Sequence, residues 1–285
     1  MADAKKTGQT DQTARSDRSV GSLASQALSV LVSRRTVKPG EMSERFLVAL
    51  SQAACSADPA ARDQVVREMM SARINRFEIA DAYIPEVARR MGEAWCDDGM
   101  SFAQVTIGVA RLQSLLRDLT ENWSVESRMY DDGLNIVVLM LADDYHTLGP
   151  MLVTSQLRRL GASVRLLLGR PLPEIMATVR DQNFDLILVS VAHVGKLVST
   201  GELITLIREN MVSPAPIVVG GPAIEFDADA KAVTGADHVS NDIKEALGLC
   251  GLMDRTKLHD RTISETCAIS ETCAMNMQTP QAPPS

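Results

Sequence analysis

The stretch LADDYHTLGP, residues 141–150, brings together a carboxylate, a histidine and a glycine that could hold a metal. Asp144 stands two positions before His146, which is one of only four histidines in the 285-residue chain, and Gly149 follows three positions later. An imidazole binds a metal through one ring nitrogen. A carboxylate that accepts a hydrogen bond from the other nitrogen fixes the tautomer and raises the basicity of the ligand. His146 is therefore either a metal ligand or an ordinary histidine in a surface loop.

The surroundings of His146 decide which metals could bind there. No second histidine, cysteine or carboxylate cluster stands nearby at the spacing of a structural zinc site. A single histidine with one carboxylate partner suits a metal that brings most of its own ligands, as in a corrin or a porphyrin. Asp144 is the better partner, because two residues along a turning chain can face His146, whereas Asp143 is expected to point to the other side of the strand. Gly149 would allow a bulky group close to the backbone, or a sharp turn, and Pro150 would begin the next helix.

The elements that would position His146 alternate between apolar strands and amphipathic helices. Apolar runs predict strands at 134–142, 163–169, 185–192, 215–221 and about 236–240, and helical patterns follow them at 150–161, 172–183, 198–211, 223–235 and 241–251. Such alternation predicts a parallel sheet that binds ligands beyond the C-terminal ends of its strands. His146 follows the first strand and Ser190 ends the third. Gly220 and Gly221 end the fourth, where a glycine pair would leave room for a flat group.

The chain before this sheet has helical periodicity. Four patterns, at 43–56, 58–70, 78–98 and 101–123, predict a small all-α bundle within residues 41–126, with N-caps at Ser43, Asp58 and Ser101. The α/β domain is expected to span residues 133–251. The flanking segments 1–40 and 255–285 are polar and are predicted to be disordered.

Composition narrows the partners and the compartment. The net charge is -7, although residues 1–40 carry seven Lys or Arg and three Asp, so direct DNA binding is expected to be weak at most. No apolar run approaches the ~18–20 residues that cross a bilayer, and no signal peptide is recognised, so no membrane association is expected. The five scattered cysteines lack a CxxC pair and favour a reducing cytoplasm.

The three strand-end motifs together resemble the pattern of the cobalamin-binding fold, which is D/E-x-H-x-x-G, then S-x-L, then G-G. The chain has Asp144-x-His146-x-x-Gly149, forty residues, Ser190-Val191-Ala192, twenty-seven residues, and Gly220-Gly221, with alanine in place of the leucine. The resemblance implies a flavodoxin-like (Rossmann-type) five-stranded parallel sheet that binds cobalamin. It also implies that His146 is the lower axial ligand of cobalt in place of dimethylbenzimidazole, and that the freed nucleotide tail enters the sheet beside Ser190 and the glycine pair.

The segment GEAWCDDGMSFAQVTIGVARLQ, residues 92–113, resembles the helical cap that precedes cobalamin domains in methionine synthase and in light-sensing repressors. By this resemblance Trp95 would cover the upper face of cobalt. Val105 and Thr106 replace the Glu-His pair of those repressors, so no upper histidine is expected from this helix, and hydroxo, aquo and adenosyl forms of the cofactor stay open. His193 is interpreted as a loop histidine that could also face the tail pocket or the upper face.

The layout of the whole chain is similar to the PpaA/AerR family of purple photosynthetic bacteria, and the segment SFAQVTIGVARLQSLLRDL carries that similarity. The resemblance implies a non-enzymatic photoreceptor that acts as an antirepressor on a CrtJ/PpsR-type transcriptional repressor of photosynthesis genes. The sequence shows neither a helix-turn-helix module nor a catalytic barrel, in agreement with such a role. Two other functions stay open: a corrinoid carrier subunit of a methyltransferase, and a haem-binding redox sensor.

Overall fold

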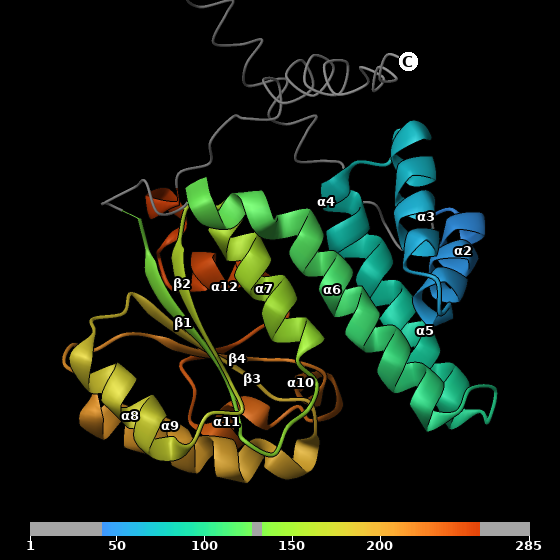
Figure 1. Ribbon diagram of the computed structural model, residues 1–285. Helices are drawn as coiled ribbons and strands as arrows, with labels where there is room; N and C mark the ends of the chain where they lie inside the picture. Colours follow the sequence, from blue (N-terminus) through green and yellow to red (C-terminus); the bar gives the residue numbers. More distant parts are fainter. Residues whose placement is uncertain (1–41, 127–132, 257–285) are drawn as a thin grey trace, which may run out of the picture. The chain divides into compact units, whose positions relative to one another are not determined.

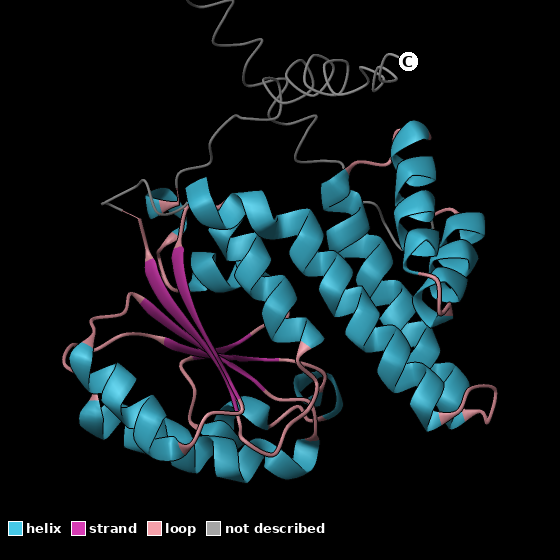
Figure 2. Ribbon diagram, in the orientation of Figure 1, coloured by secondary structure: helices cyan, strands magenta, loops and turns pink. Residues whose placement is uncertain are grey.

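A computed structural model of the chain describes residues 42–126 and 133–256. The segment 1–40 and nearly all of 255–285, which were predicted to be disordered, lie outside these residues. The described chain consists of helices up to residue 126, followed by a sheet with flanking helices (Figure 2). None of the described helices is both long and apolar enough to cross a membrane.

The helical part consists of four rods, as the periodicity predicted. They are α2 (Glu44–Cys55), α3 (Pro59–Ser71), a continuous helix formed by α4 (Arg76–Glu78), the π-helix η1 (Ile79–Tyr83) and α5 (Ile84–Cys96), and the long α6 (Phe102–Glu126). Their apolar faces meet in one core, with the buried side chains Phe46, Leu47, Leu50, Met69, Ile79, Ile84, Val87, Met91, Leu112 and Leu116.

Two of the three predicted N-caps make the side-chain hydrogen bond of a helix cap. The Asp58 carboxylate accepts a hydrogen bond of 2.9 Å from the Ala60 N–H, and the Ser101 hydroxyl caps α6 by accepting one of 3.3 Å from the Gln104 N–H. Ser43 is the N-cap residue of α2 as predicted, but its side chain makes no capping hydrogen bond. Its backbone N–H instead donates to the hydroxyl of Tyr83, at 3.0 Å, so this end of α2 is tied to the π-helix.

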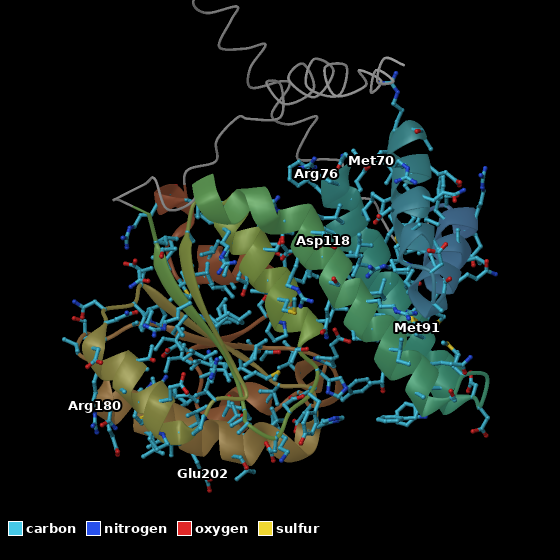
Figure 3. The ribbon with its side chains drawn as sticks, viewed as in Figure 1. Met70, Arg76, Met91, Asp118, Arg180 and Glu202 are labelled. Carbon is cyan, nitrogen blue, oxygen red and sulfur yellow. The ribbon has the colours of Figure 1, made fainter. Side chains whose placement is uncertain are left out.

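A close approach between α5 and α6 depends on Gly108. A Cβ atom at residue 108 would lie 2.0 Å from the terminal methyl group of Met91. Met91 is 1% exposed, and Figure 3 labels it on the helix that runs beside α6. A flexible methionine opposite a glycine therefore fills the contact between the two helices.

The π-helix carries a link to the α/β part. A π-helical segment accommodates one extra residue in a helix and often occurs at functional places. Asp81, in this segment, forms an ion pair with Arg159 of α7 (Leu148–Arg159), and the Arg159 guanidinium lies 5.2 Å from the centre of the Phe77 ring.

The sheet is parallel and five-stranded, with the strand order β2-β1-β3-β4-β5. Its strands are β1 (Asn135–Met140), β2 (Ser163–Leu168), β3 (Leu186–Ser190), β4 (Ile217–Gly220) and β5 (His238–Val239). This is the flavodoxin-like order, so the predicted fold class is confirmed. Met140, Ser190 and Gly220 are register partners across β1, β3 and β4, which places the predicted strand ends side by side.

Alternate residues of the central strands face opposite helical layers. One face packs on α8 (Leu172–Asp181) and α9 (Leu197–Asn210), and the other packs on α7 and α12 (Ile243–Leu249), as Figure 1 shows. The first face has Val137, Leu139, Ile187 and Val189, and the second has Ile136, Val138, Leu186 and Leu188. Burial on both faces explains why these strands read as unbroken apolar runs.

Two predicted helices differ from the observed ones. The pattern at 223–235 forms two short helices, α10 (Ala223–Phe226) and α11 (Ala230–Thr234), because Asp227 is extended and its carboxylate accepts a hydrogen bond of 2.9 Å from the Asp229 N–H. Helix α7 begins at Leu148, two residues before the predicted start at Pro150. Proline is tolerated there because N–H groups in the first helical turn have no partner within the helix.

Candidate functional site

The strand order reverses between β1 and β3, so the loops after these two strands leave the sheet on either side of its switch point. The loop after β1, residues 141–147, carries His146. The loop after β3, residues 191–196, begins next to Ser190 and ends in the short 3-10 helix η3 (Val194–Lys196). The predicted motif residues of three strands are thereby gathered at one edge of the sheet.

Asp144 holds His146 and the neighbouring loop together. One carboxylate oxygen, Oδ1, lies 3.0 Å from Nδ1 of the His146 ring and accepts a second hydrogen bond of 3.0 Å from the His146 backbone N–H. The other oxygen, Oδ2, accepts a hydrogen bond of 3.1 Å from the Ala192 N–H. The Asp144 side chain is 2% exposed and the His146 side chain is 59% exposed. The hydrogen bond predicted from the spacing is therefore present, and Nε2 is the ring nitrogen that can bind a metal.

Asp143, as predicted, is not the carboxylate that pairs with the His146 ring. Its carboxylate forms an ion pair with the ammonium group of Lys196 at the end of the second loop. The two consecutive aspartates therefore bind the same loop in different ways. Asp144 does so from a buried position through a backbone N–H, and Asp143 does so at the surface through a lysine.

The electrostatics keep Asp144 ionised. Burial raises the pKa of the Asp144 carboxyl, but the hydrogen bonds from the His146 and Ala192 backbone and from the His146 ring together outweigh burial, so the pKa lies below its usual value. An ionised carboxylate can only accept a hydrogen bond, so Nδ1 of His146 is assigned the proton. The lone pair of the imidazole is then on Nε2.

The glycines of the motif differ in what surrounds them. A Cβ at Gly149 would meet no atom within 4 Å, and Gly149 lies in the first turn of α7 rather than in a sharp turn, so the space beside it is open. At Gly221, where φ is +105°, a Cβ would lie 2.4 Å from the carbonyl oxygen of Val191, and at Gly220 it would lie 2.8 Å from that of Ser240. Backbone atoms of neighbouring loops therefore occupy the place that a Cβ would take at both glycines, and room for a flat group beside the pair stays a prediction.

His193 lies against His146, a contact that the sequence did not predict. The two ring centroids are 4.9 Å apart and the ring planes make an angle of 80°, an edge-to-face arrangement. The only signal in the sequence was the position of His193 three residues after Ser190. That position places His193 near His146 only because β3 lies next to β1 in the sheet.

Trp95 lies on the surface of the helical part rather than in its core. Its side chain is 48% exposed and packs at a tilt against Phe102, which is 68% exposed, with ring centroids 6.0 Å apart. Val105 packs at the edge of the bundle core, and the hydroxyl of Thr106 donates a hydrogen bond of 2.8 Å to the Phe102 carbonyl. Neither residue replaces the imidazole that the light-sensing repressors carry there.

The edge of the sheet fits a metal that carries its own equatorial ligands. Within the described residues, no group of three or more His, Cys, Asp or Glu side chains is arranged to hold a metal ion. His146 therefore offers one nitrogen, oriented by a carboxylate, next to the open space at Gly149. This donor set suits the cobalt of a corrinoid, whose macrocycle supplies the remaining nitrogens.

Comparisons with known proteins agree with this chemistry. Residues 134–247 match the family model of the B12 binding domain. An uncharacterized 20.5 kDa protein in the bchF-crtJ intergenic region of Rhodobacter capsulatus is 33% identical over 181 residues, which cover 64% of this chain and 94% of the relative. The monomethylamine corrinoid protein of Methanosarcina barkeri has the same fold, with a TM-score of 0.59 at 16% identity over 74% of this chain and 99% of that one. The chain therefore binds cobalamin and belongs to the PpaA/AerR family.

Proposed function

We propose that this protein is a light-responsive, cobalamin-dependent regulator of transcription, which acts as an antirepressor on a CrtJ/PpsR-type repressor of photosynthesis genes. The observation that carries the proposal is the relative at 33% identity, whose gene lies between bchF and crtJ. A position beside the repressor gene supports a shared pathway. The protein acts in the cytoplasm and controls DNA through its protein partner rather than by binding operator DNA itself.

His146 is the lower ligand in this proposal. Nε2 would hold cobalt in place of dimethylbenzimidazole, and Asp144 would keep the imidazole in the required tautomer. Ser190, Gly220 and Gly221 lie at the strand ends beside which the displaced nucleotide tail inserts. When bound, cobalamin would supply the light-sensitive chemistry.

Light acts through the contacts of the upper ligand. Trp95 and Phe102 form the exposed aromatic pair that meets this ligand in the proposal. A change of ligand shifts the helices only if it contacts them differently in the two states. A large, partly exposed aromatic pair would provide such a difference, because Trp95 and Phe102 would gain apolar contacts from an organic ligand that they would not gain from water.

A corrinoid carrier for a methyltransferase is the second candidate, and the fold shared with the monomethylamine corrinoid protein favours it. A carrier would be isolated with methylcobalamin and would exchange its methyl group with a barrel partner. A haem sensor is the third candidate, and an intense Soret band after reconstitution with haemin would distinguish it from the broader bands of a cobalamin protein.

The test measures repressor binding in two cofactor states. The full chain is loaded in the dark with adenosylcobalamin or hydroxocobalamin, and its binding to immobilised CrtJ/PpsR-type repressor is recorded before and after illumination. We expect binding to change at least about tenfold, equal to ~1.4 kcal/mol, between the dark and illuminated adenosylcobalamin forms. His146→Ala should lose the response. Equal binding in all states would overturn the regulatory proposal while leaving cobalamin binding intact.

A further inference from the structure

We propose that His193 is a positioning residue for the cobalt ligand, in that its ring holds the imidazole of His146 in the orientation that presents Nε2 to cobalamin. The inference rests on His146 as the lower ligand. It adds a residue from a second strand end to the site.

The need for such a residue follows from the exposure of His146. Its side chain is 59% exposed and projects from a loop, and the one ring hydrogen bond found for it joins Nδ1 to Asp144. A hydrogen bond at Nδ1 fixes where that nitrogen points, but it leaves the ring plane free to rock about the bond. An exposed hydrogen bond also competes with water. A second contact on the ring restrains the plane that the carboxylate leaves free.

His193 makes that second contact. The centroid separation of 4.9 Å and the interplanar angle of 80° correspond to the edge-to-face geometry that aromatic rings prefer. The edge of one ring against the face of the other opposes the rocking motion. The hydrogen bond and the ring contact therefore restrain different rotations of the same imidazole.

The backbone on both sides of His193 is fixed, so the contact is built into the fold. Before it, the Ala192 N–H donates to Asp144 at 3.1 Å and the Val191 N–H donates to the Gly220 carbonyl at 2.9 Å. After it, the Lys196 N–H donates to the His193 carbonyl at 2.9 Å, and the Lys196 side chain pairs with Asp143. The loop that presents His193 is thus tied to the loop that presents His146 by both aspartates.

Two roles are conceivable for His193, and they predict different behaviour for the His193→Phe variant. If the ring contact matters, phenylalanine at position 193 preserves the role, because it keeps an aromatic edge and face. If a ring nitrogen of His193 binds the corrinoid, phenylalanine fails as alanine does. The exposed location and the ring geometry support the first role, so His193→Phe is the decisive variant.

The experiment uses the full chain, labelled throughout with the heavy nitrogen isotope, and unlabelled cobalamin. After reduction to the cobalt(II) form, electron paramagnetic resonance shows a doublet splitting from a labelled histidine and a triplet from unlabelled dimethylbenzimidazole. We expect a sharp doublet in the wild type and in His193→Phe. In His193→Ala we expect a broadened or mixed splitting, together with roughly two- to tenfold faster release of hydroxocobalamin.

Controls separate this inference from the lower-ligand assignment. His238→Ala, a histidine on β5, should retain the wild-type spectrum and release rate, and the melting temperature of each cofactor-free variant should match that of the wild type. A wild-type doublet that is unchanged in His193→Ala would overturn the role of His193 alone, as would a His193→Phe variant that behaves like His193→Ala. A wild-type triplet would overturn the assignment of His146 and this inference with it.

Discussion

The side-chain amide of Gln113 on α6 donates a hydrogen bond of 2.8 Å to the hydroxyl of Thr147, the residue that follows His146. Helix α7, which starts at the next residue, is bound at its other end by the Arg159–Asp81 ion pair. The helix that follows His146 is thus attached to the helical part at both ends. A displacement of the helical part has a direct route to the loop that carries His146.

A double-mutant cycle of Gln113→Ala and Thr147→Val measures this attachment. We expect a coupling energy of about 0.5–1.5 kcal/mol in the free energy of unfolding, since a neutral side-chain hydrogen bond is removed in either variant. Urea titration of the cofactor-free chain supplies the energies. The control pairs Gln113→Ala with Thr205→Val, because the Thr205 hydroxyl donates to a carbonyl of its own helix. The changes in the free energy of unfolding should be additive for this pair. A coupling no larger than in the control would contradict the link.

Neutralising Asp144 should weaken cobalamin binding. Asp144→Asn removes the charge that fixes the His146 tautomer, and loss of such an outer carboxylate lowers metal affinity by about 10- to 100-fold. Asp143→Asn is the matched control, because its carboxylate pairs with Lys196 at the surface, and we expect an affinity within about threefold of the wild type. Absorbance titration with hydroxocobalamin measures both. Equal affinities for the two variants would rule out a special role for the buried carboxylate.

The motif glycines should separate stability from ligand binding. Gly221→Ala forces a side chain into a positive φ and against the Val191 carbonyl, so we expect the cofactor-free protein to lose about 2 kcal/mol or more of stability. Gly149→Ala adds a methyl group to open space and should leave stability unchanged or raise it by about 0.5 kcal/mol. Gly149→Leu should lower cobalamin affinity with little effect on the melting temperature. Thermal unfolding measures the stability of the three variants, and titration with cobalamin measures their affinity. A Gly149→Leu variant that binds cobalamin as tightly as the wild type would contradict the prediction.

Glu86 should give the helical part an acid-sensitive contribution to stability. The hydrogen bond from Arg89 is the main cause that lowers its pKa from 4.5 to about 2; burial opposes it, and Arg90 adds to the decrease. Because the pKa is lower in the folded state, the stabilisation is present above about pH 4.5 and is lost as the pH falls towards 2. Glu86→Gln should therefore cost about 1 kcal/mol at neutral pH and nothing near pH 2.

The measurement is thermal unfolding of both proteins across this pH range. Glu93→Gln is a suitable control, because Glu93 is an exposed partner of Arg89, and its effect should stay below about 0.5 kcal/mol at every pH. A difference between wild type and Glu86→Gln that persists unchanged to pH 2 would contradict the predicted sign.

The fold was predictable because strands that are buried on both faces have nearly continuous apolar runs in the sequence. The runs that contain Ile136, Leu188 and Val218 are almost entirely apolar, and helical patterns separate them, so a parallel sheet was expected. The position of His146 beyond β1 and its bond to Asp144 also followed, because both depend on local chain geometry.

Contacts between distant segments were not predictable in the same way. The His146–His193 contact depends on β3 lying beside β1, and the tight packing of Gly221 depends on the backbone of Val191. The break at Asp227 was missed because one Asp–Asp turn leaves the apolar period of the flanking helices unchanged. The π-helix was also missed, since its buried residues Ile79 and Ala80 lie four and three positions before Tyr83, as they would on one face of an α-helix.

That π-helix takes up one extra residue within the helix in which it lies. Asp81 is inside the wide turn, and Trp95 stands near the far end of the same rod. Each residue of an α-helix turns the chain by about 100°. Because the wide turn absorbs one extra residue, deleting one residue of Ile79–Tyr83 would restore an ordinary helix and leave Trp95 on nearly the same side of that helix. The extra residue is therefore taken up locally, in the turn from which Asp81 reaches Arg159, while the direction of the aromatic pair is preserved.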